Sequence, residues 1–317
     1  MIIITAMLRC GKPLVAAVSA GVALVASACA SGPAAAPGAG SSDAVVAVGA
    51  ENEYANVLAQ VGGKYVQVSA VMSNPATDPH TYEASSSVAQ KISSAQLVVQ
   101  NGIGYDTFMT TIENAVPNSA RKVIDVQKLL GLPDNTPNPH LWYKPSTMPV
   151  VANAMAADLA SLEPAHAAYF RANARTFISS LAGWNGAIAA FKAKYGGTPV
   201  ATTEPVADYM LQAVGADNET PFTFQANIMN GVDLPAQSVA LEKNLFTQHK
   251  VKAFLYNQQV TSALTQSFIA LAHRSGIPVV GVYETMPAPG YDYQSWMLTE
   301  VRDLQKAVSS KTSAEHL

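Results

Sequence analysis

One apolar stripe with helical periodicity constrains this 317-residue chain more than any other feature. Between Pro164 and Lys194, large apolar side chains recur at spacings of three and four residues, as on one face of a helix. The stripe consists of Phe170, Ala174, Phe177, Ile178, Leu181, Trp184, Ile188 and Phe191. No strong helix breaker follows until Gly196. A helix over 164–194 would be about 46 Å long, more than one α/β domain needs, so we predict that it crosses between two lobes.

Short apolar runs alternate with helical stretches on both sides of this helix. Strands are predicted at 45–48, 66–71, 97–99, 122–126, 199–203, 253–256 and 279–283. Helices are predicted at 51–61, 85–94, 105–115, 146–162, 205–214, 235–245, 261–275 and 292–309. Repeated βα units build mainly parallel sheets with helices on both faces. We therefore predict an α/β fold of two Rossmann-like βα lobes, at 45–145 and 198–317, joined by linking helices at 146–197 that include one long backbone helix.

The start of the chain reads as an export signal. Arg9 and Lys12 precede an uncharged apolar run over 14–28, which is too short for a comfortable membrane span and typical of a signal peptide over 1–28. The small residues before Cys29 resemble a bacterial lipobox, so we expect Cys29 to be acylated; plain secretion is the alternative. Residues 29–44 lack large apolar side chains and read as a flexible tether. We expect an exported protein anchored to the outer face of the cytoplasmic membrane.

Composition excludes several classes of function. Both cysteines, Cys10 and Cys29, precede the predicted domain, so it has no disulfide, no Cys-ligated zinc or iron–sulfur cluster and no Cys nucleophile. Without Arg9 and Lys12, 17 basic residues remain against 22 acidic ones, a net charge of −5 with no basic stripe. Nucleic acid is therefore not an expected partner.

Four side chains with metal-binding chemistry follow predicted strands. His80 and His140 each come directly after a proline in the first lobe, while Glu204 and Glu284 come directly after strands of the second lobe. In open α/β sheets, ligands bind at the carboxyl ends of the strands. Two neutral imidazoles and two carboxylates would neutralise a dication. This donor set suits zinc, manganese or ferrous iron better than calcium or magnesium, and we predict such a site in the cleft between the lobes.

At these residues the chain resembles the manganese/zinc solute-binding proteins of bacterial metal ABC importers, the TroA-like or cluster 9 family. The segments 78–83 and 138–143 look like the two histidine motifs of that family, and 95–106 is similar to the stretch that follows the first. Glu204 falls at the third ligand position and Glu284 at the fourth, which is more often Asp. The resemblance implies a monomer that performs no chemistry, binds one metal ion between its lobes and delivers it to an ABC permease in the membrane.

The metal is not fixed by the sequence. The chain lacks the His-rich insertion of many zinc-dedicated members and has Glu204 where many have a third His, which favours Mn²⁺ or Fe²⁺. Zinc nevertheless outcompetes manganese at most mixed nitrogen and oxygen sites. Mn²⁺ and Zn²⁺ therefore both remain open, with Fe²⁺ behind them. Two other functions also remain open: a metallohydrolase that uses the same two-His, two-carboxylate site, and a binder of a chelated iron ligand.

Overall fold

The computed structural model describes residues 44–77 and 82–317. The chain divides into two units, Met1–Ser42 and Asp43–Leu317, of which the first lies outside the described residues. The acylation predicted at Cys29 therefore falls on a residue that the structure does not describe. None of the helices within 44–77 and 82–317 combines the length and the apolar character needed to cross a membrane.

The first lobe is built on a four-stranded parallel sheet with the strand order β2-β1-β3-β4. The strands are β1 (Val45–Glu51), β2 (Val66–Met72), β3 (Leu97–Gln100) and β4 (Lys122–Asp125). The helices are α1 (Asn52–Gly62), α2 (Ser86–Ser94), α3 (Thr107–Ala115) and α4 (Val126–Leu129). Side chains alternate between the two faces: Ala47 and Leu97 belong to the core that includes α1, whereas Val48 and Val98 belong to the core that includes α2 and α3.

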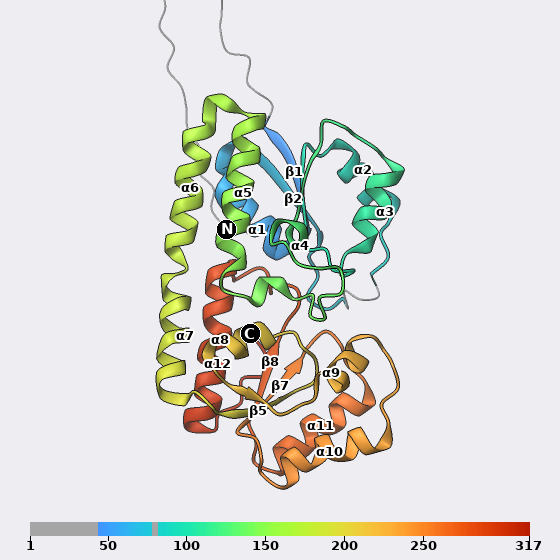
Figure 1. The fold of residues 1–317 in the computed structure, drawn as a ribbon, viewed down its shortest axis with the longest axis vertical. Helices are drawn as coiled ribbons and strands as arrows, with labels where there is room; N and C mark the ends of the chain where they lie inside the picture. The colour runs from blue at the N-terminus through green and yellow to red at the C-terminus, as the bar shows by residue number, and fades with distance from the viewer. Residues whose placement is uncertain (1–43, 78–81) are drawn as a thin grey trace, which may run out of the picture. The chain divides into compact units, whose positions relative to one another are not determined.

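The second lobe repeats this plan with the strand order β6-β5-β7-β8, again all parallel (Figure 1). The strands are β5 (Pro199–Thr202), β6 (Asp217–Asn218), β7 (Ala253–Asn257) and β8 (Val279–Val282). The helices are α8 (Asp208–Val214), α9 (Phe222–Met229), α10 (Ala236–Thr247), α11 (Ala263–Arg274) and α12 (Tyr293–Ser310). The predicted two-lobed α/β class is thereby confirmed.

The linking segment differs from the prediction in one respect. It consists of α5 (Thr147–Leu162), a 3₁₀ turn (Pro164–His166), α6 (Ala167–Ser180) and α7 (Ala182–Tyr195), so the single helix predicted over 164–194 is wrong. The break lies at Leu181, whose N–H bonds the carbonyl of Ile178 instead of that of Phe177. The hydroxyl of Ser180 donates to the Phe177 carbonyl at 2.7 Å and so takes the place of the missing helical bond.

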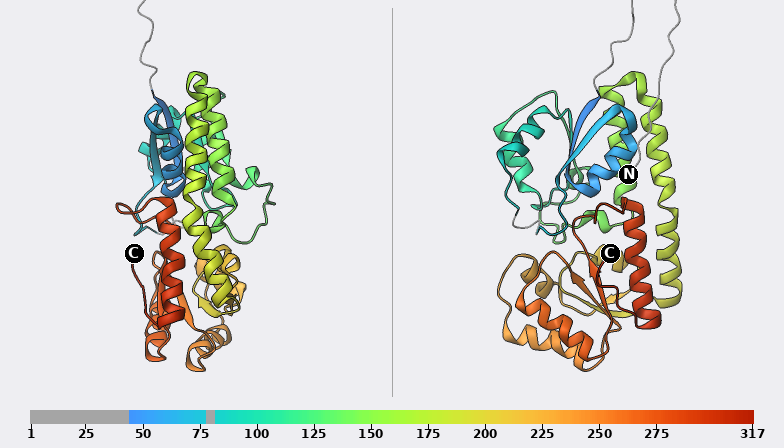
Figure 2. Two further views of the ribbon diagram at one scale, coloured as in Figure 1. Left: turned by 90° about the vertical axis from the view of Figure 1, so that its left-hand side faces the viewer. Right: turned by 180° about the vertical axis from the view of Figure 1, so that it is seen from behind.

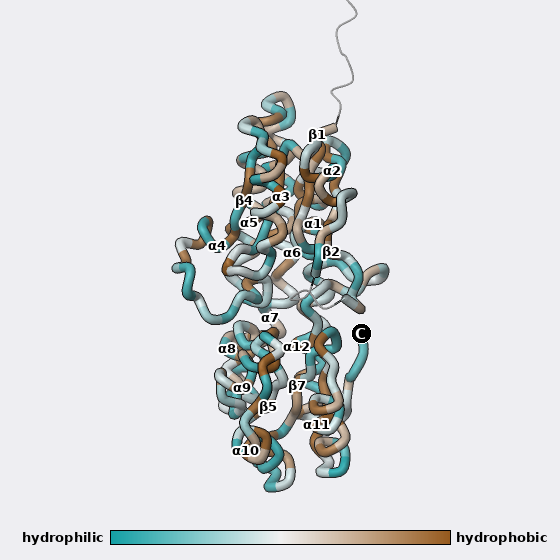
Figure 3. Tube along the Cα trace, turned by 90° about the vertical axis from the view of Figure 1, so that its right-hand side faces the viewer, coloured by the Kyte–Doolittle hydropathy of each residue, from teal (hydrophilic) through white to brown (hydrophobic). Residues whose placement is uncertain are grey.

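The two helices still run end to end past both lobes (Figure 2). Helix α6 packs on α1 of the first lobe and on α5 of the linking segment, whereas α7 packs on α8 and α12 of the second lobe. The predicted stripe faces inward, with Ile178 half-buried and its other members buried. One apolar core cluster contains side chains from both sheets and from α5, α6, α7 and α12. Figure 3 shows the hydrophobic stretches of the trace inside both lobes.

Candidate metal centre

Polar side chains of the second lobe gather at the carboxyl ends of its strands. Glu204 follows β5 by two residues, Asn257 is the last residue of β7, and Glu284 follows β8 by two residues. The strand order places β6 and β7 on opposite sides of β5, so the chain changes direction across the sheet at this point. Ligands of open α/β sheets bind at such switch points, and these three side chains are at most 2% exposed.

His140 comes from the first lobe and is held by Asn138. The backbone N–H of His140 donates to Asn138 Oδ1 at 3.0 Å, and the ring nitrogen Nδ1 lies 2.8 Å from the same oxygen. The amide nitrogen of Asn138 donates to the Pro205 carbonyl at 2.8 Å, which fixes Oδ1 as the atom facing the ring. Because Oδ1 can only accept, Nδ1 carries the ring proton and Nε2 is directed at the site.

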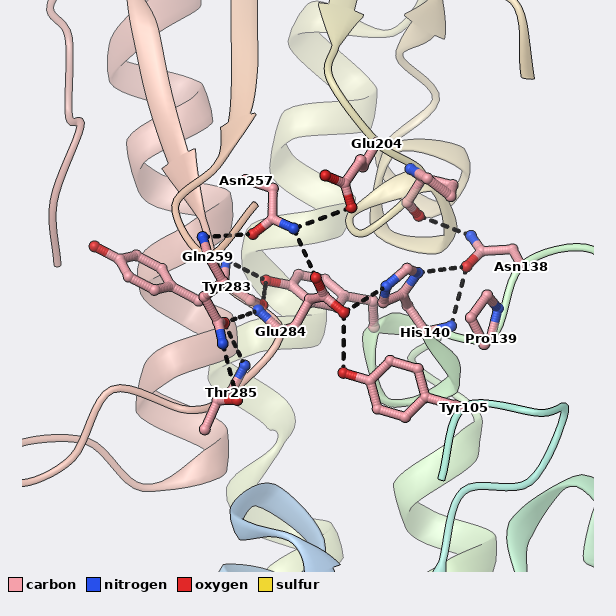
Figure 4. A network of polar contacts seen from close by, with 12 residues as sticks. Tyr105, Asn138, Pro139, His140, Glu204, Asn257, Gln259, Tyr283, Glu284 and Thr285 are labelled. Atoms are coloured by element: carbon pink, nitrogen blue, oxygen red, sulfur yellow. Dashed lines mark hydrogen bonds and ion pairs between the residues drawn. The ribbon is translucent and has the colours of Figure 1, made fainter. Parts of the chain in front are cut away.

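The Nε2 atom of His140 meets the carboxylate of Glu284. The distance from Nε2 to Glu284 Oε2 is 3.2 Å, and both side chains are fully buried. The hydroxyl of Tyr105 donates to the same carboxylate oxygen at 3.0 Å (Figure 4). The ring of Trp142 packs edge-on against the imidazole, with ring centroids 5.4 Å apart. A nitrogen donor of one lobe thus faces an oxygen donor of the other inside an aromatic enclosure.

Asn257 joins the two carboxylates of the second lobe. Its amide nitrogen donates to Glu204 Oε2 at 3.1 Å and to Glu284 Oε1 at 2.6 Å (Figure 4). The two acidic side chains therefore lie within hydrogen-bonding distance of one nitrogen atom. Asn257 is neutral, so it brings two like charges together without adding a third.

Gln259 connects the site to the first lobe. Its Oε1 accepts from the backbone N–H groups of Glu284 at 2.6 Å and Thr285 at 2.7 Å. Its Nε2 donates to Thr285 Oγ1 at 3.0 Å and to the carbonyl of Thr77 at 2.8 Å. Thr77 is the last described residue before the segment that contains His80. One amide side chain thus links the backbone of Glu284 to the first-lobe loop that leads to His80.

A left-handed stretch of backbone places Tyr105. Gly102, Ile103 and Gly104 have φ values of 81°, 55° and 73°, in a region that glycine adopts readily. The N–H of Ile103 donates to Gln127 Oε1 at 2.7 Å, which holds the loop between β3 and α3. A side chain at position 102 would clash with Gln127, since its Cβ would lie 2.7 Å from that of Gln127. The loop geometry therefore depends on glycine and presents Tyr105 to the site.

Three further carboxyl groups are buried in the first lobe near the site. Burial, together with the nearby Asp106 carboxyl, raises the pKa of Glu51 well above its usual range. Burial, reinforced by the charge of Glu284, does the same to the pKa of Glu53. The pKa of Asp106 is raised by burial to about 6, although the N–H groups of Asn101 and Gly102 donate to it and oppose the rise. Burial thus favours the neutral forms of Glu51 and Glu53.

The structure brings three of the four predicted ligands close together and does not describe the fourth. His140 and Glu284 are in direct contact, and Glu204 is joined to Glu284 through Asn257. His80 lies outside the described residues, and among 44–77 and 82–317 no group of three His, Cys, Asp or Glu side chains is arranged to hold a metal ion. Sequence reasoning missed Tyr105, Asn257 and Gln259. The rule of strand ends, applied to β7 as well, would have indicated Asn257 and Gln259, whereas Tyr105 lies five residues beyond the end of β3.

Comparison with known proteins gives one family match over most of the chain. The family model described as zinc-uptake complex component A, periplasmic, matches residues 48–307. Among curated relatives, the manganese-binding lipoprotein MntA of Bacillus subtilis (strain 168) is 27% identical over 136 residues, which cover 41% of this chain. The match spans 44% of that relative, less than half of its length.

Solved structures share the fold. A crystal structure of ZnuA has a TM-score of 0.69 at 20% identity and covers 84% of this chain and 100% of its own. The solute-binding protein FpvC from P. aeruginosa, in complex with Ni²⁺, also has a TM-score of 0.69 at 20% identity, with coverages of 86% and 100%. A manganese-bound periplasmic metal-binding protein from Candidatus Liberibacter asiaticus has a TM-score of 0.66 at 18% identity, with coverages of 83% and 99%. At these identities the likeness establishes the fold alone.

Proposed function

Because the chain belongs to the zinc-uptake complex component A family, whose members are metal-binding transport proteins and not enzymes, we propose that it captures one divalent transition-metal ion for an ABC permease. The ion is Mn²⁺ or Zn²⁺, with Fe²⁺ less favoured. The observation that carries the proposal is the buried contact between His140 and Glu284, 3.2 Å long, in which each lobe contributes one metal-binding group. Proteins of this fold have been solved with manganese, cadmium and Ni²⁺.

The proposed ligands are His80, His140, Glu204 and Glu284. Neutral imidazole and carboxylate are suitable donors for these ions, and two of each balance the charge of a dication. A metal entering between His140 Nε2 and Glu284 Oε2 would replace their direct contact with two coordinate bonds. Asn138 holds the proton at Nδ1, and an imidazole protonated there binds a metal through Nε2 once Nε2 carries no proton.

Different observations argue against the two alternatives, a metallohydrolase and a binder of a chelated iron ligand. Family members are transport proteins, so the metallohydrolase is set aside. A chelated iron ligand needs a cleft large enough for an organic chelator. His140, Glu204 and Glu284 are instead 0–2% exposed and within reach of one another or of Asn257, which suits a bare ion.

Metal titration of the purified domain tests the proposal. We expect the protein prepared without added metal to bind one equivalent of Mn²⁺ or Zn²⁺. Replacing His140 or Glu204 by alanine should lower the affinity for the metal by well over about tenfold. His273→Ala is the matched control, because His273 makes a similar contact with Glu315, 3.3 Å long, at the surface. Unchanged titrations of both site variants would exclude this site.

The export and anchoring steps complete the proposal. We expect the lipid-anchored, monomeric protein to act outside the cytoplasmic membrane, and the matching relative from Bacillus subtilis is a lipoprotein. Expression of the full chain in a bacterium, followed by membrane fractionation, tests the anchor at Cys29. The native protein should sediment with the membranes and the Cys29→Ser variant should not. If both proteins stay in the soluble fraction, plain secretion is the better account.

A further inference from the structure

A row of amide side chains lies along one face of α1 in the first lobe. Asn52, Asn56 and Gln60 are spaced four residues apart, so their side chains lie one after another along the helix. Asn52 is buried, whereas Asn56 and Gln60 are half-buried. All three form hydrogen bonds with the part of the second lobe between Met286 and Gln294, where the chain passes from β8 into α12. The row therefore connects the two lobes.

At one end of the row, Asn52 holds the backbone of Met286 on both sides. Its Nδ2 donates to the Met286 carbonyl at 2.8 Å, and its Oδ1 accepts the Met286 N–H at 2.9 Å. Because the amide nitrogen can only donate and the amide oxygen can only accept, these two bonds fix the orientation of the side chain. Asn52 is 7% exposed and Met286 is 4% exposed, so water has little access to the pair.

At the other end, two side chains hold the start of α12. Asn56 Oδ1 accepts the Tyr293 N–H at 3.1 Å and also accepts from Gln60 Nε2 at 2.7 Å. Gln60 and Gln294 donate to each other, at 3.1 Å and 2.9 Å. The loop between Met286 and Tyr293 is thus fixed to α1 at both of its ends.

This loop begins two residues beyond the proposed ligand Glu284. The N–H groups of Glu284 and Thr285 donate to Gln259 of the second lobe, and the next N–H along the chain, that of Met286, donates to Asn52 of the first lobe. The backbone is therefore held at three consecutive positions. A carboxylate on such a backbone has little more than its side-chain torsions to order when it binds an ion, and less ordering leaves more of the binding free energy as affinity.

We propose that Asn52 is a positioning residue for Glu284, which fixes the backbone beyond this ligand to the first lobe and so keeps the carboxylate beside His140 before an ion arrives. This inference rests on the proposed function, in which Glu284 binds the metal. Asn56 and Gln60 support the same position by holding the far end of the loop. Metal affinity thereby depends on α1, a helix that carries none of the four proposed ligands.

A double-mutant cycle in zinc affinity tests this role. Asn52→Ala should lower the affinity for Zn²⁺ by about tenfold or more when Glu284 is present. In the Glu284→Ala background, which retains His140 and Glu204 for zinc, the same change should have no further effect, because the side chain that Asn52 positions is then missing. Losses of equal size in both backgrounds, or no loss in either, would overturn the proposal.

Asn173→Ala is the matched control. Asn173 is a half-buried amide on α6, and its Nδ2 donates to a backbone carbonyl of α1, that of Val61, at 3.0 Å. It makes the same kind of bond to the same helix, but at the end of α1 opposite to Asn52. Its removal should leave the zinc affinity unchanged. A loss as large as that of Asn52→Ala would show that any weakened contact of α1 lowers the affinity, and would overturn the specific role of Asn52.

Hydrogen exchange in the native protein, followed by NMR, provides a measurement that needs no variant. Because the Met286 N–H bonds to Asn52, we expect it to exchange slowly in the metal-free protein and to change little when Zn²⁺ is added. Fast exchange that becomes slow only with Zn²⁺ would show that the ion orders this segment, which would overturn the proposal and leave the transport function standing. A native protein that binds neither Zn²⁺ nor Mn²⁺ would instead refute the proposed function, and this inference with it.

Discussion

His140 Nε2 lies 3.2 Å from Glu284 Oε2, although the two residues are 144 positions apart in the sequence and belong to different lobes. Neither side chain is exposed, and Tyr105 donates to the same carboxylate oxygen. A pair of groups from opposite lobes at this distance lets one ion act as a bridge between the lobes. Binding of the ion and closure of the lobes are therefore expected to be coupled.

Replacement of Asn138 by alanine should weaken metal binding without unfolding the protein. The change removes the oxygen that accepts from both the backbone N–H and Nδ1 of His140. The ring would then be free to rotate and to take the other tautomer, so we expect a loss of about 10- to 100-fold in affinity. Calorimetric titration measures the loss. Asn138→Asp keeps an acceptor at this position and should retain more affinity than Asn138→Ala; the reverse order would contradict the role given to Asn138.

Replacement of Gln259 by alanine should speed the release of bound metal. The change removes the bonds that join the backbone of Glu284 and Thr285 to the carbonyl of Thr77 in the other lobe. We expect the dissociation rate to rise by about tenfold in stopped-flow mixing with a chelator. The side-chain amide of the neighbouring Gln258 instead donates to the Glu315 carbonyl at 2.6 Å, so Gln258→Ala is the control. Equal metal dissociation rates for the two variants would contradict the proposed role of Gln259 in retaining the metal.

Glu300 should make the stability of the metal-free protein depend on pH, so that the free energy of unfolding falls as the pH rises. This buried residue accepts from Tyr143 and Trp296, both at Oε1, and its Oε2 has no partner among the described residues. Burial raises its pKa from 4.5 to about 8, against the effect of these two hydrogen bonds. Between these two values the folded protein keeps a proton that the unfolded chain has lost. Its contribution to the free energy of unfolding is therefore fully present below the lower value and is lost as the pH rises through the window.

Glu300→Gln removes this titration while it keeps an oxygen for Tyr143 and Trp296. We expect the variant to become more stable relative to the native protein as the pH rises from about 5 to about 8. Urea denaturation at both pH values, in the presence of a chelator, measures the difference. A stability difference that stays constant over this range would show that Glu300 does not exchange its proton on unfolding.

Gly281 leaves room for the segment around Ala314 and Glu315 to pack on β8. A Cβ atom at this position would lie 2.0 Å from the Glu315 carbonyl oxygen, and the adjoining Ala314 bonds the backbone of Val279 and Gly281. Gly281→Ala should therefore displace the segment around Ala314 and lower the free energy of unfolding by about 1–3 kcal/mol. Gly186→Ala in α7 meets no atom within 4 Å and should raise it by about 0.5–1 kcal/mol. Thermal denaturation distinguishes the two signs, and a stabilising Gly281→Ala would refute the close contact.

Local patterns predicted most of the fold because strands and long helices carry their own periodicity. The exceptions have little or no such signal. Strand β6 is only Asp217–Asn218, and the break at Leu181 depends on a side-chain bond from Ser180 to Phe177. At the site, the chemistry of imidazole and carboxylate indicated His140, Glu204 and Glu284. Asn257 escaped notice because an amide is not a typical metal ligand, and its partners lie 53 and 27 positions away.

The apolar core that runs through both lobes has a thermodynamic consequence. Side chains of both sheets belong to one cluster together with α6, α7 and α12, so melting one lobe would expose apolar surface of the other to water. We expect unfolding to be cooperative over Asp43–Leu317, with one calorimetric peak whose enthalpy equals the van't Hoff value. An ion held by a few side chains would then protect every element of the unit against heat, and its affinity could be read from the shift in melting temperature.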